Sequence, residues 1–211
     1  MNRIDGIIWD WNGTLLNDIE LCVLTINEML GRRKLDLLSV DDYREVFSFP
    51  VRNYYQKIGF DFKTEPFEIP ALEFINRYNE QMNGCSLHQD AFRVLNHFHC
   101  QGNRQFILSA MEQNALEDCL KHQQINHFFE HVSGLDNHYA VSKMENGHRL
   151  ISDWNLNPAD LVIIGDTVHD YEVAVGLGCR CILVANGHQS REVLNSTGAL
   201  VIDRLEQLLD S

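Results

Sequence analysis

The stretch Ile7-Ile8-Trp9-Asp10-Trp11-Asn12-Gly13-Thr14 leads from an apolar run directly into an acidic residue and a tight polar loop. The run from Ile4 to Trp9 predicts a buried strand, with Asp10 at its carboxyl end. Open α/β sheets place their reacting groups at that end of the strands. Gly13 lets the backbone turn tightly beside a ligand. We therefore expect Asp10 to act as a nucleophile.

Short apolar runs alternate with helical segments along most of the remaining chain. Further strands are predicted at residues 106–108, 131–134, 161–164, 181–184 and 200–202, and helices at about 88–100, 113–123, 142–154 and 168–177. Buried runs of this length between helices are typical of parallel βαβ units. The predicted fold class is therefore α/β, with a doubly wound parallel sheet.

Residues 17–83 differ from the rest because they predict four helices and no strand. Their signals include a capping box at Ser39–Asp42 and a proline, Pro50, at a helix start. We expect a catalytic core of residues 1–16 and 84–211, interrupted after its first strand by this α-helical cap domain. An insert at that point is well placed to act as a lid over the carboxyl ends of the strands.

The composition excludes several classes of partner. The chain has 211 residues and a formal net charge of −13, from 17 Lys and Arg against 30 Asp and Glu. An acidic surface argues against binding to nucleic acid or to an anionic membrane. No apolar run is long enough for a transmembrane helix, and no signal peptide is visible. The six cysteines form no Cys-x-x-Cys pair, so we expect them to be reduced, in a cytoplasmic protein.

Polar residues capable of chemistry end three of the predicted strands: Asp10, Ser109 and Asp166. Lys143 lies near the start of the helix after the third predicted strand, and Asp170 lies four residues beyond Asp166. Each of these residues alone is more often a helix cap or a surface charge. At these positions in the topology, however, all of them would converge on one crevice of the sheet.

The chemistry of a phosphoryl group explains these residue types. A cluster of Asp10, Asp166 and Asp170 is costly unless a cation offsets its charge, and carboxylate oxygens suit Mg²⁺. The metal and Lys143 would neutralise a phosphoryl group, to which Ser109 and the backbone N–H groups after Asp10 would donate hydrogen bonds. Asp10 would attack phosphorus and form an aspartyl-phosphate, which water would hydrolyse. The expected partner is a small-molecule phosphate ester.

The same residues resemble the motifs of the haloacid dehalogenase superfamily. The matching segments are Asp10-x-Asn12-Gly13-Thr14, Ser109 after Phe-Ile-Leu, Lys143, and Gly165-Asp166-Thr167-x-x-Asp170. The helical insert resembles the small cap of the phosphoglycolate phosphatase-like branch. The resemblance implies that Asp10 is the nucleophile. It places Mg²⁺ on Asp10, the backbone carbonyl of Asn12, Asp166 and Asp170. It places the phosphoryl group on Trp11, Asn12, Ser109, Ala110 and Lys143.

Position 12 departs from the pattern of this superfamily. Most of its phosphatases carry a second Asp there, which protonates the leaving alcohol and then activates water. The side chain of Asn12 cannot shuttle a proton, and general acid–base catalysis is typically worth roughly 10²–10⁴ in rate. Replacing Asn12 by Asp is therefore expected to raise the rate on alkyl phosphates.

Several explanations for Asn12 stay open. A histidine would supply the proton, with His138, His169 and His188 as candidates by type. Alternatively, the substrate would have a good leaving group, as acyl and aryl phosphates do. Alternatively, the protein would be a catalytically weak phosphate-binding or regulatory protein.

The cap raises two further questions. A phosphonatase-like hydrolase of C–P bonds would use a cap lysine as a Schiff base, and Lys34, Lys57 and Lys63 are the candidates. Cap side chains would also select the substrate, with Phe49, Arg52, Tyr54 and Tyr55 as the residues we single out. No pattern in the sequence assigns an oligomeric state.

Overall fold

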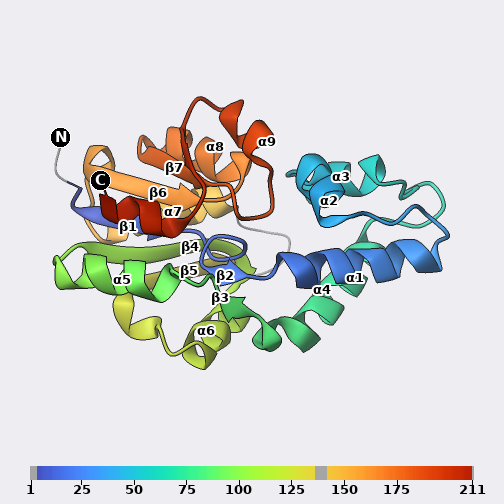
Figure 1. Ribbon diagram of the computed structural model, residues 1–211, viewed down its shortest axis with the longest axis horizontal. Coiled ribbons are helices and arrows are strands. Elements are labelled where there is room, and N and C mark those ends of the chain that lie inside the picture. Colours follow the sequence, from blue (N-terminus) through green and yellow to red (C-terminus); the bar gives the residue numbers. More distant parts are fainter. Residues whose placement is uncertain (1–3, 136–141, 211) are drawn as a thin grey trace.

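The computed structural model describes residues 4–135 and 142–210. Its main sheet has six parallel strands in the order β5-β4-β1-β6-β7-β8 (Figure 1). The strands are β1 (Gly6–Trp9), β4 (Arg104–Glu112), β5 (His131–Leu135), β6 (Leu161–Gly165), β7 (Arg180–Val184) and β8 (Leu200–Ile202). Ile8 of β1 pairs with Phe106 on one side and with Ile163 on the other. Asp10 therefore follows an interior strand and is flanked by two neighbouring strand ends.

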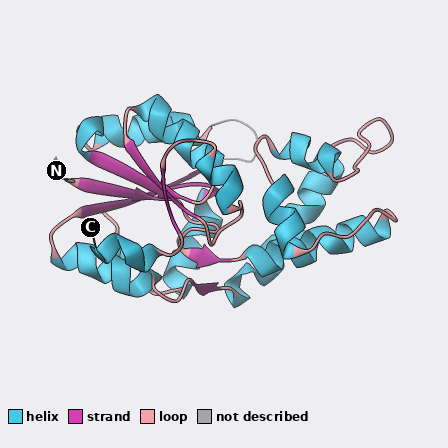
Figure 2. Ribbon diagram, turned by 45° about the horizontal axis from the view of Figure 1, so that its top comes forward, coloured by secondary structure: helices cyan, strands magenta, loops and turns pink. Residues whose placement is uncertain are grey.

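Helices cover both faces of the sheet (Figure 2). Side chains alternate along a strand, so Ile7 and Trp9 of β1 face one hydrophobic layer and Ile8 faces the other. The first layer includes α5 (Ala91–Cys100), α6 (Gln113–His122) and the short helix η4 (Leu205–Asp210); the second includes α7 (Lys143–Asp153) and α8 (Val168–Leu177). All four residues of β1 are buried, as a central parallel strand requires.

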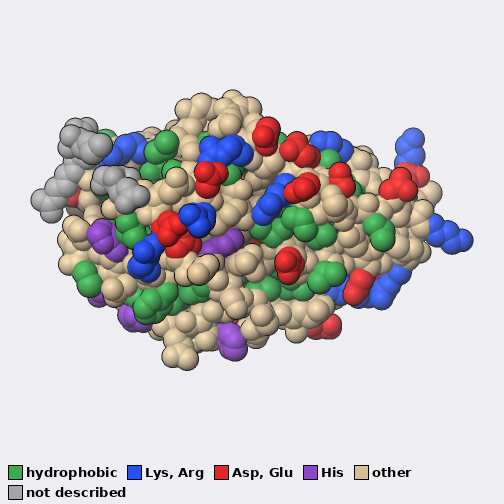
Figure 3. Space-filling model, in the orientation of Figure 1, with side chains coloured by type: hydrophobic (Ala, Val, Ile, Leu, Met, Phe, Trp, Pro, Cys, Tyr) green, Lys and Arg blue, Asp and Glu red, His purple; other side chains and the backbone are tan. Residues whose placement is uncertain are grey.

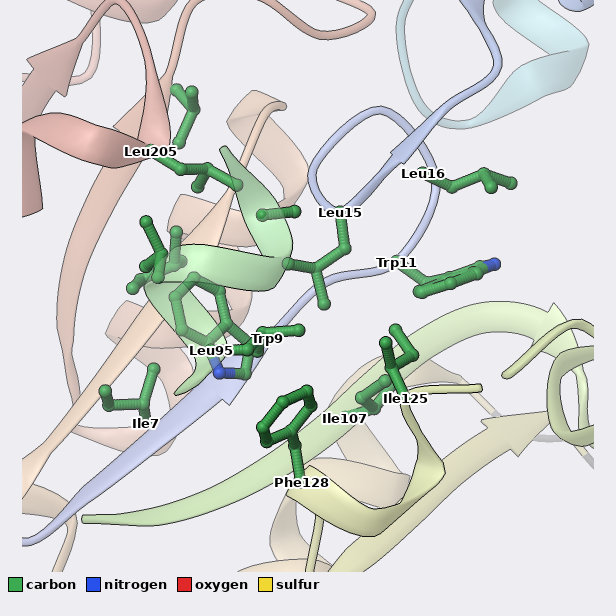
Figure 4. Close-up of a cluster of buried hydrophobic side chains, with 14 of the residues drawn as sticks. Ile7, Trp9, Trp11, Leu15, Leu16, Leu95, Ile107, Ile125, Phe128 and Leu205 are labelled. Carbon is green, nitrogen blue, oxygen red and sulfur yellow. The ribbon is translucent and has the colours of Figure 1, made fainter. Parts of the chain in front are cut away.

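The loop after β1 is anchored in the core (Figure 4). The side chains of Trp11, Leu15 and Leu16 are fully buried in the layer that contains α5 and α6. Gly13 has a φ of 73°, and a Cβ at this position would lie 2.3 Å from Asp166 Oδ2. Glycine is therefore required here by both the backbone conformation and the lack of space.

The four helices that follow this loop form a unit with its own hydrophobic cluster. They are α1 (Ile19–Arg32), α2 (Val40–Val46), α3 (Val51–Lys57) and α4 (Glu68–Gln81). Buried side chains such as Ile26, Met29 and Tyr55 form that cluster. The strands β2 (Leu16–Asn17) and β3 (Ser86–Leu87) pair antiparallel, so the two connections between this unit and the sheet are joined to each other.

Helix α2 docks the helical unit onto the loop that follows β7. The guanidinium of Arg44 donates hydrogen bonds to the carbonyls of Gly187 at 3.0 Å and Asn186 at 3.2 Å. Gln189 donates from its side chain to the carbonyl of Phe47 at 2.8 Å. These contacts hold the unit over the carboxyl edge of the sheet.

The predicted fold class is confirmed, including the four-helix insert after the first strand. The capping box at Ser39–Asp42 forms, and Pro50 is the N-cap residue of α3. The prediction missed short elements that show no hydrophobic period, namely β2, β3, α9 (Arg191–Asn195), η1 (Met82–Gly84), η2 (Asn126–Phe128), η3 (Pro158–Asp160) and η4. Two-residue strands and single helical turns are too short for a periodic pattern.

The surface shows no segregation of charge on the face drawn in Figure 3, where basic side chains lie among acidic ones. Exposed pairs such as Arg191–Asp203 and Arg93–Glu206 are examples of this mixing. All six cysteines are free. In the described part of the chain, no helix combines the length and apolar character needed to cross a membrane.

Candidate functional site

The polar residues predicted to end the strands meet at the carboxyl edge of the sheet. Asp10 follows β1 and Asp166 follows β6, but Ser109 lies within β4, which continues to Glu112 beyond the predicted strand end. Lys143 is the first residue of α7, where Ser142 forms a capping box that fixes the start of the helix. All four side chains are buried, with at most 8% of each residue exposed.

Asp170 joins this cluster through its role as a helix cap. It occupies the first turn of α8, where Thr167 donates to its Oδ2 from the backbone at 3.0 Å and from the hydroxyl at 2.7 Å. The other oxygen of Asp170 faces Lys143 Nζ at 2.5 Å. The capping interaction therefore orients a carboxylate into the site, so the capping role of Asp170 is compatible with the predicted metal-binding role.

Lys143 connects two of the three carboxylates, because its Nζ donates to both Asp10 and Asp170. The third, Asp166, accepts from the Thr14 hydroxyl at 2.9 Å and from the backbone N–H of His188 at 2.5 Å. Ser109 Oγ accepts from the backbone N–H of Met111 at 3.1 Å, which leaves its hydroxyl proton available to a ligand.

Burial and mutual repulsion control the charge of this cluster. Burial, with Asp170 and Asp166 nearby, raises the pKa of Asp10 to about 8 against the opposing charge of Lys143. Burial likewise raises the pKa of Asp166 to about 6. Asp170 is also buried, but its ion pair with Lys143 holds its pKa below the usual value. Negative charge is in excess, so a cation bound here would favour ionised Asp10.

The donor set suits a hard divalent cation. Carboxylate oxygens of Asp10, Asp166 and Asp170 lie within 4.8 Å of one another, and all three residues are buried. Oxygen-only ligands of this kind fit Mg²⁺. Asp18, Cys22 and His188 lie equally close together, but the Asp18 carboxylate is already occupied by several protein donors.

Asn12 is held in place by two groups from outside its own loop. Its side-chain amide donates to Asp18 Oδ2 at 2.9 Å and to the Tyr78 hydroxyl, on α4, at 2.7 Å. The Tyr78 hydroxyl in turn donates to Asp18 Oδ2 at 2.7 Å, and the Gly13 N–H donates to Asp18 Oδ1 at 2.9 Å. Asp18 is thus the centre of a network that links the loop after β1 to the helical unit.

His188 completes this network on the other side. Its Nε2 lies 3.3 Å from Asp18 Oδ1 and its Nδ1 lies 3.0 Å from the Tyr43 hydroxyl. Burial opposes protonation, but the Asp18 carboxylate outweighs it and raises the pKa of His188 to about 9. Burial would raise the pKa of Asp18, yet His188 and the hydrogen bonds lower it to about 2. The two residues therefore form a buried ion pair at neutral pH.

The sequence interpretation missed Asp18 and Tyr43. Asp18 is the residue before α1, yet its side chain makes no capping hydrogen bond. It turns towards position 12 instead. An acidic residue at a helix start reveals another role only when its hydrogen-bond partner is known. Tyr43 and His188 lie 145 residues apart in the chain, so the sequence does not indicate that they meet.

The free energy of unfolding is expected to depend on pH through His188. Its folded pKa of about 9 exceeds the unfolded value of 6.5, which corresponds to roughly 3 kcal/mol. This contribution is complete below pH 6.5 and is lost as the pH rises through about 9. Urea unfolding of the wild type and of His188→Gln should therefore give a stability difference that shrinks between pH 7 and 9.5. The exposed His148→Gln variant is the matched control, and a difference independent of pH would contradict the ion pair.

A cavity of about 450 Å³ adjoins the cluster and extends under α2, α3 and α4. Its lining includes Asp10, Asn12, Ser109, Ala110, Lys143 and Asp170. Three of the four cap residues predicted to select the substrate, Phe49, Tyr54 and Tyr55, also line it. The side chain of Trp11 is buried in the core, so only its backbone can face a ligand.

Arg52, predicted to select the substrate, and the lysines predicted for a Schiff base lie outside the cavity lining. Arg52 is absent from the cavity lining, and its exposed guanidinium stacks over Phe62 at 4.8 Å. The three cap lysines, Lys34, Lys57 and Lys63, are likewise exposed and outside the lining.

The three candidate histidines are placed differently. His188 and His169 both line the cavity, and the ring of His169 packs on Phe49 at 4.9 Å between centroids. His138 lies outside the described residues.

Comparison with known proteins identifies the family of this chain. Residues 7–184 match the family model of the haloacid dehalogenase-like hydrolases. No curated protein is found to match in sequence. Among solved structures, a predicted phosphatase from Clostridium acetobutylicum is similar over 99% of this chain and 97% of its own, with 16% identity and a TM-score of 0.83.

Two further structures are similar along nearly their whole length. A predicted phosphoglycolate phosphatase from Haemophilus somnus has 18% identity and a TM-score of 0.78, with 100% of this chain and 98% of that chain covered. CbbY from Rhodobacter sphaeroides, in complex with phosphate, has 17% identity and a TM-score of 0.73, with 97% and 96% covered. At such identities the likeness establishes the fold.

Proposed function

The chain belongs to the haloacid dehalogenase-like hydrolases, and on that premise we propose that it is a Mg²⁺-dependent phosphatase that hydrolyses a small-molecule phosphate monoester through an aspartyl-phosphate on Asp10. The observation that carries this proposal is the buried cluster in which Lys143 joins Asp10 to Asp170, beside Asp166 and open to a cavity. Repulsion between the buried carboxylates of such a cluster is offset when a cation binds. The cation and Lys143 together can then bind a phosphoryl group.

Asp10 is the proposed nucleophile. One of its oxygens would form a bond to phosphorus while the bond from phosphorus to the ester oxygen breaks. Lys143, the Ser109 hydroxyl and the backbone N–H groups of Trp11, Asn12 and Ala110 would stabilise the charge on the phosphoryl oxygens. Water would then hydrolyse the aspartyl-phosphate and release inorganic phosphate.

Asp10, Asp166, Asp170 and the backbone carbonyl of Asn12 would hold Mg²⁺. When bound, the metal supplies positive charge that offsets the carboxylates and the phosphoryl oxygens. The protein itself prepares the site: Thr14 and the His188 N–H orient Asp166, and Thr167 orients Asp170.

The proposed division into domains follows the hydrophobic clusters of the structure. We assign residues 1–16 and 84–211 to a catalytic core and residues 17–83 to a cap. The separate clusters of the cap and the sheet layers support this division. The β2–β3 pair is the point at which the two parts join.

A second candidate function is phosphate binding with weak or regulatory activity. The observation in its favour is Asn12, whose amide donates to Asp18 and Tyr78 and cannot carry a proton to a leaving group. The phosphonatase-like alternative loses support, because its Schiff-base lysine would have to reach the cavity and all three cap lysines are exposed outside it.

A panel of phosphate esters tests the proposal. With Mg²⁺, we expect turnover of acyl and aryl phosphates, with alkyl phosphates slower by roughly 10²–10⁴ because they need the missing proton donor. Chelation by EDTA should abolish turnover, and added Mg²⁺ should raise the Tm of the wild type but not of Asp166→Asn. Absence of metal-dependent turnover on every ester, with phosphate still bound, would favour the binding protein instead.

A further inference from the structure

The two ends of the cavity differ in chemistry. At the sheet end lie the charged residues Asp10, Lys143 and Asp170. The cap contributes mainly aromatic side chains, among them Phe47, Phe49, Tyr54, Phe67, Phe74 and Tyr78. These come from α3, α4 and the segments beside them, and several pack edge-to-face or stacked on one another, such as Phe74 on Tyr78 at 6.0 Å. A bound molecule would thus have its phosphoryl group at one end and rings around its other half.

The cap offers nothing that would hold a second negative charge. Residues 17–83 are all described, and none of their lysines or arginines lines the cavity. In the described lining the one lysine is Lys143, which is already paired with two carboxylates, and His188 is already paired with Asp18. His169 faces Glu172, and Glu112 adds negative charge. A carboxylate or second phosphate on the substrate would lose its hydration there without gaining a cation.

One buried polar group of the cap lacks a hydrogen-bond partner among the described residues. Tyr54 lines the cavity and is 2% exposed, and its hydroxyl makes no hydrogen bond to any described residue. A buried hydroxyl without a partner costs free energy unless a ligand or water satisfies it. A ligand could therefore gain a polar contact here, beside the mainly aromatic side chains that the cap contributes.

We propose that the substrate is an aryl phosphate: one phosphoryl group on an aromatic ring system that the cap rings enclose, with a polar ring substituent in reach of the Tyr54 hydroxyl. This inference rests on the proposed phosphatase function and names its substrate class. Cavities of roughly 300–1,000 Å³ hold ligands of this kind, and the one here has about 450 Å³. Aromatic side chains favour stacked or edge-to-face contact with such a ring.

The residue at position 12 agrees independently with this substrate class. When Asp10 attacks phosphorus, the electron pair of the breaking P–O bond leaves on the phenolic oxygen. A phenolate is a stable leaving group and takes its proton from water afterwards, so no side chain needs to donate one. Asn12, held by Asp18 and Tyr78, is compatible with that reaction and poorly suited to alkyl esters.

The first test compares 1-naphthyl phosphate, acetyl phosphate and phosphoglycolate with the full-length protein and Mg²⁺. Burial of a naphthyl group in the cavity should lower KM by about tenfold or more relative to acetyl phosphate. Phosphoglycolate, with its added carboxylate, should be the poorest substrate. Equal KM values for naphthyl and acetyl phosphate would overturn the aryl assignment and leave the phosphatase function standing.

A binding measurement separates the two proposals. Calorimetry with 1-naphthylmethylphosphonate and methylphosphonate, which cannot be hydrolysed as esters, requires no turnover. Tighter binding of the naphthyl compound, by about tenfold or more, supports the cavity assignment even if no ester is hydrolysed, in which case the phosphatase proposal alone fails. Equal affinities overturn the cavity assignment.

Substitutions in the cap test whether its aromatic side chains cause the difference in affinity. Phe74→Ala should raise the Kd of the naphthyl compound by roughly 5–10-fold and leave that of methylphosphonate unchanged. Phe62→Ala is the matched control, since Phe62 is also a partly buried cap phenylalanine but lies outside the cavity lining. Tyr54→Phe, which keeps the ring, should raise KM for 4-methylumbelliferyl phosphate, which carries a carbonyl group, and not for 1-naphthyl phosphate. An equal loss in Phe74→Ala and Phe62→Ala, with no effect of Tyr54→Phe, would overturn the assignment.

Discussion

Replacement of Asp10 by Asn is expected to reduce turnover of 4-nitrophenyl phosphate to no more than about 10⁻³ of the wild-type rate, because an amide cannot attack phosphorus to form the acyl phosphate. The substitution preserves shape and removes one of three buried carboxylates. Burial and the neighbouring acids raise the pKa of Asp10 to about 8, so the carboxylate is not stabilised by its surroundings without a cation. The Tm of the variant is therefore not expected to fall.

Three measurements complete the Asp10→Asn experiment. Initial rates with saturating Mg²⁺ give the loss of activity, and thermal unfolding shows that the fold is intact. Acid quenching during turnover of a radiolabelled ester should trap covalent phosphate on the wild type and none on the variant. Asp153→Asn, at an exposed position in α7, is the matched control and should retain full activity. Substantial turnover by Asp10→Asn would exclude this residue as the nucleophile.

The second large effect is expected at position 12, and the structure indicates that a single substitution there is not enough to produce it. In Asn12→Asp, a carboxyl oxygen would replace an amide nitrogen that lies 2.9 Å from Asp18 Oδ2. Two carboxylates at that distance do not both ionise. Asp18 is held ionised, with a pKa of about 2, so the new carboxyl would keep its proton and donate it to Asp18. The single variant should gain little on alkyl phosphates.

The double variant Asn12→Asp with Asp18→Asn removes this conflict. An amide at position 18 would donate to the new carboxylate and still accept from the Gly13 N–H, which now bonds to Asp18 Oδ1. The carboxyl group at position 12 would then be free to exchange a proton with the leaving oxygen. We expect the rate on alkyl phosphates to rise by roughly 10²–10⁴, with little change on aryl phosphates.

A double-mutant cycle on kcat for glycerol phosphate and 4-nitrophenyl phosphate measures this coupling. Asp18→Asn alone is the control for loss of the pair with His188, which lies 3.3 Å from Asp18. The two single changes should be strongly non-additive on the alkyl ester, since the residues are in direct contact. If Asn12→Asp alone matched the double variant, Asp18 would not restrain position 12. If neither accelerated alkyl ester hydrolysis, the proton-transfer argument would be wrong.

Several elements were predictable because their signals are local. β1 and β6 are short buried runs, and parallel strands bring their carboxyl ends to one edge, so Asp10 and Asp166 had to lie close together once the topology was assigned. Lys143 and Asp170 followed from their positions in the first turns of α7 and α8. Gly13 also followed, since a tight turn beside a ligand requires it.

Other features depend on contacts between distant segments. Asn12 and Tyr78 are 66 residues apart in the chain, and Asp18 and His188 belong to the first and last parts of the structure. His188 was a candidate only by residue type. Arg52 and Lys57 were candidates from their position in the chain, but α3 is too short to show from its sequence which side faces the sheet. Lys34 and Lys63 lie between helices, where no periodic pattern indicates a direction.

The sequence by itself determined the parallel sheet, the helical insert and the catalytic carboxylates proposed at the strand ends. The hydrophobic period and the succession of strands and helices along the chain can both be read from contiguous residues. Only the tertiary structure decided what surrounds them. Packing of the cap against the loop after β7 brings His188 to Asp18 and closes an aromatic cavity over Asp10. The partners in those contacts are set by the docking of the cap cluster onto the layers of the sheet, a long-range arrangement that no local pattern encodes.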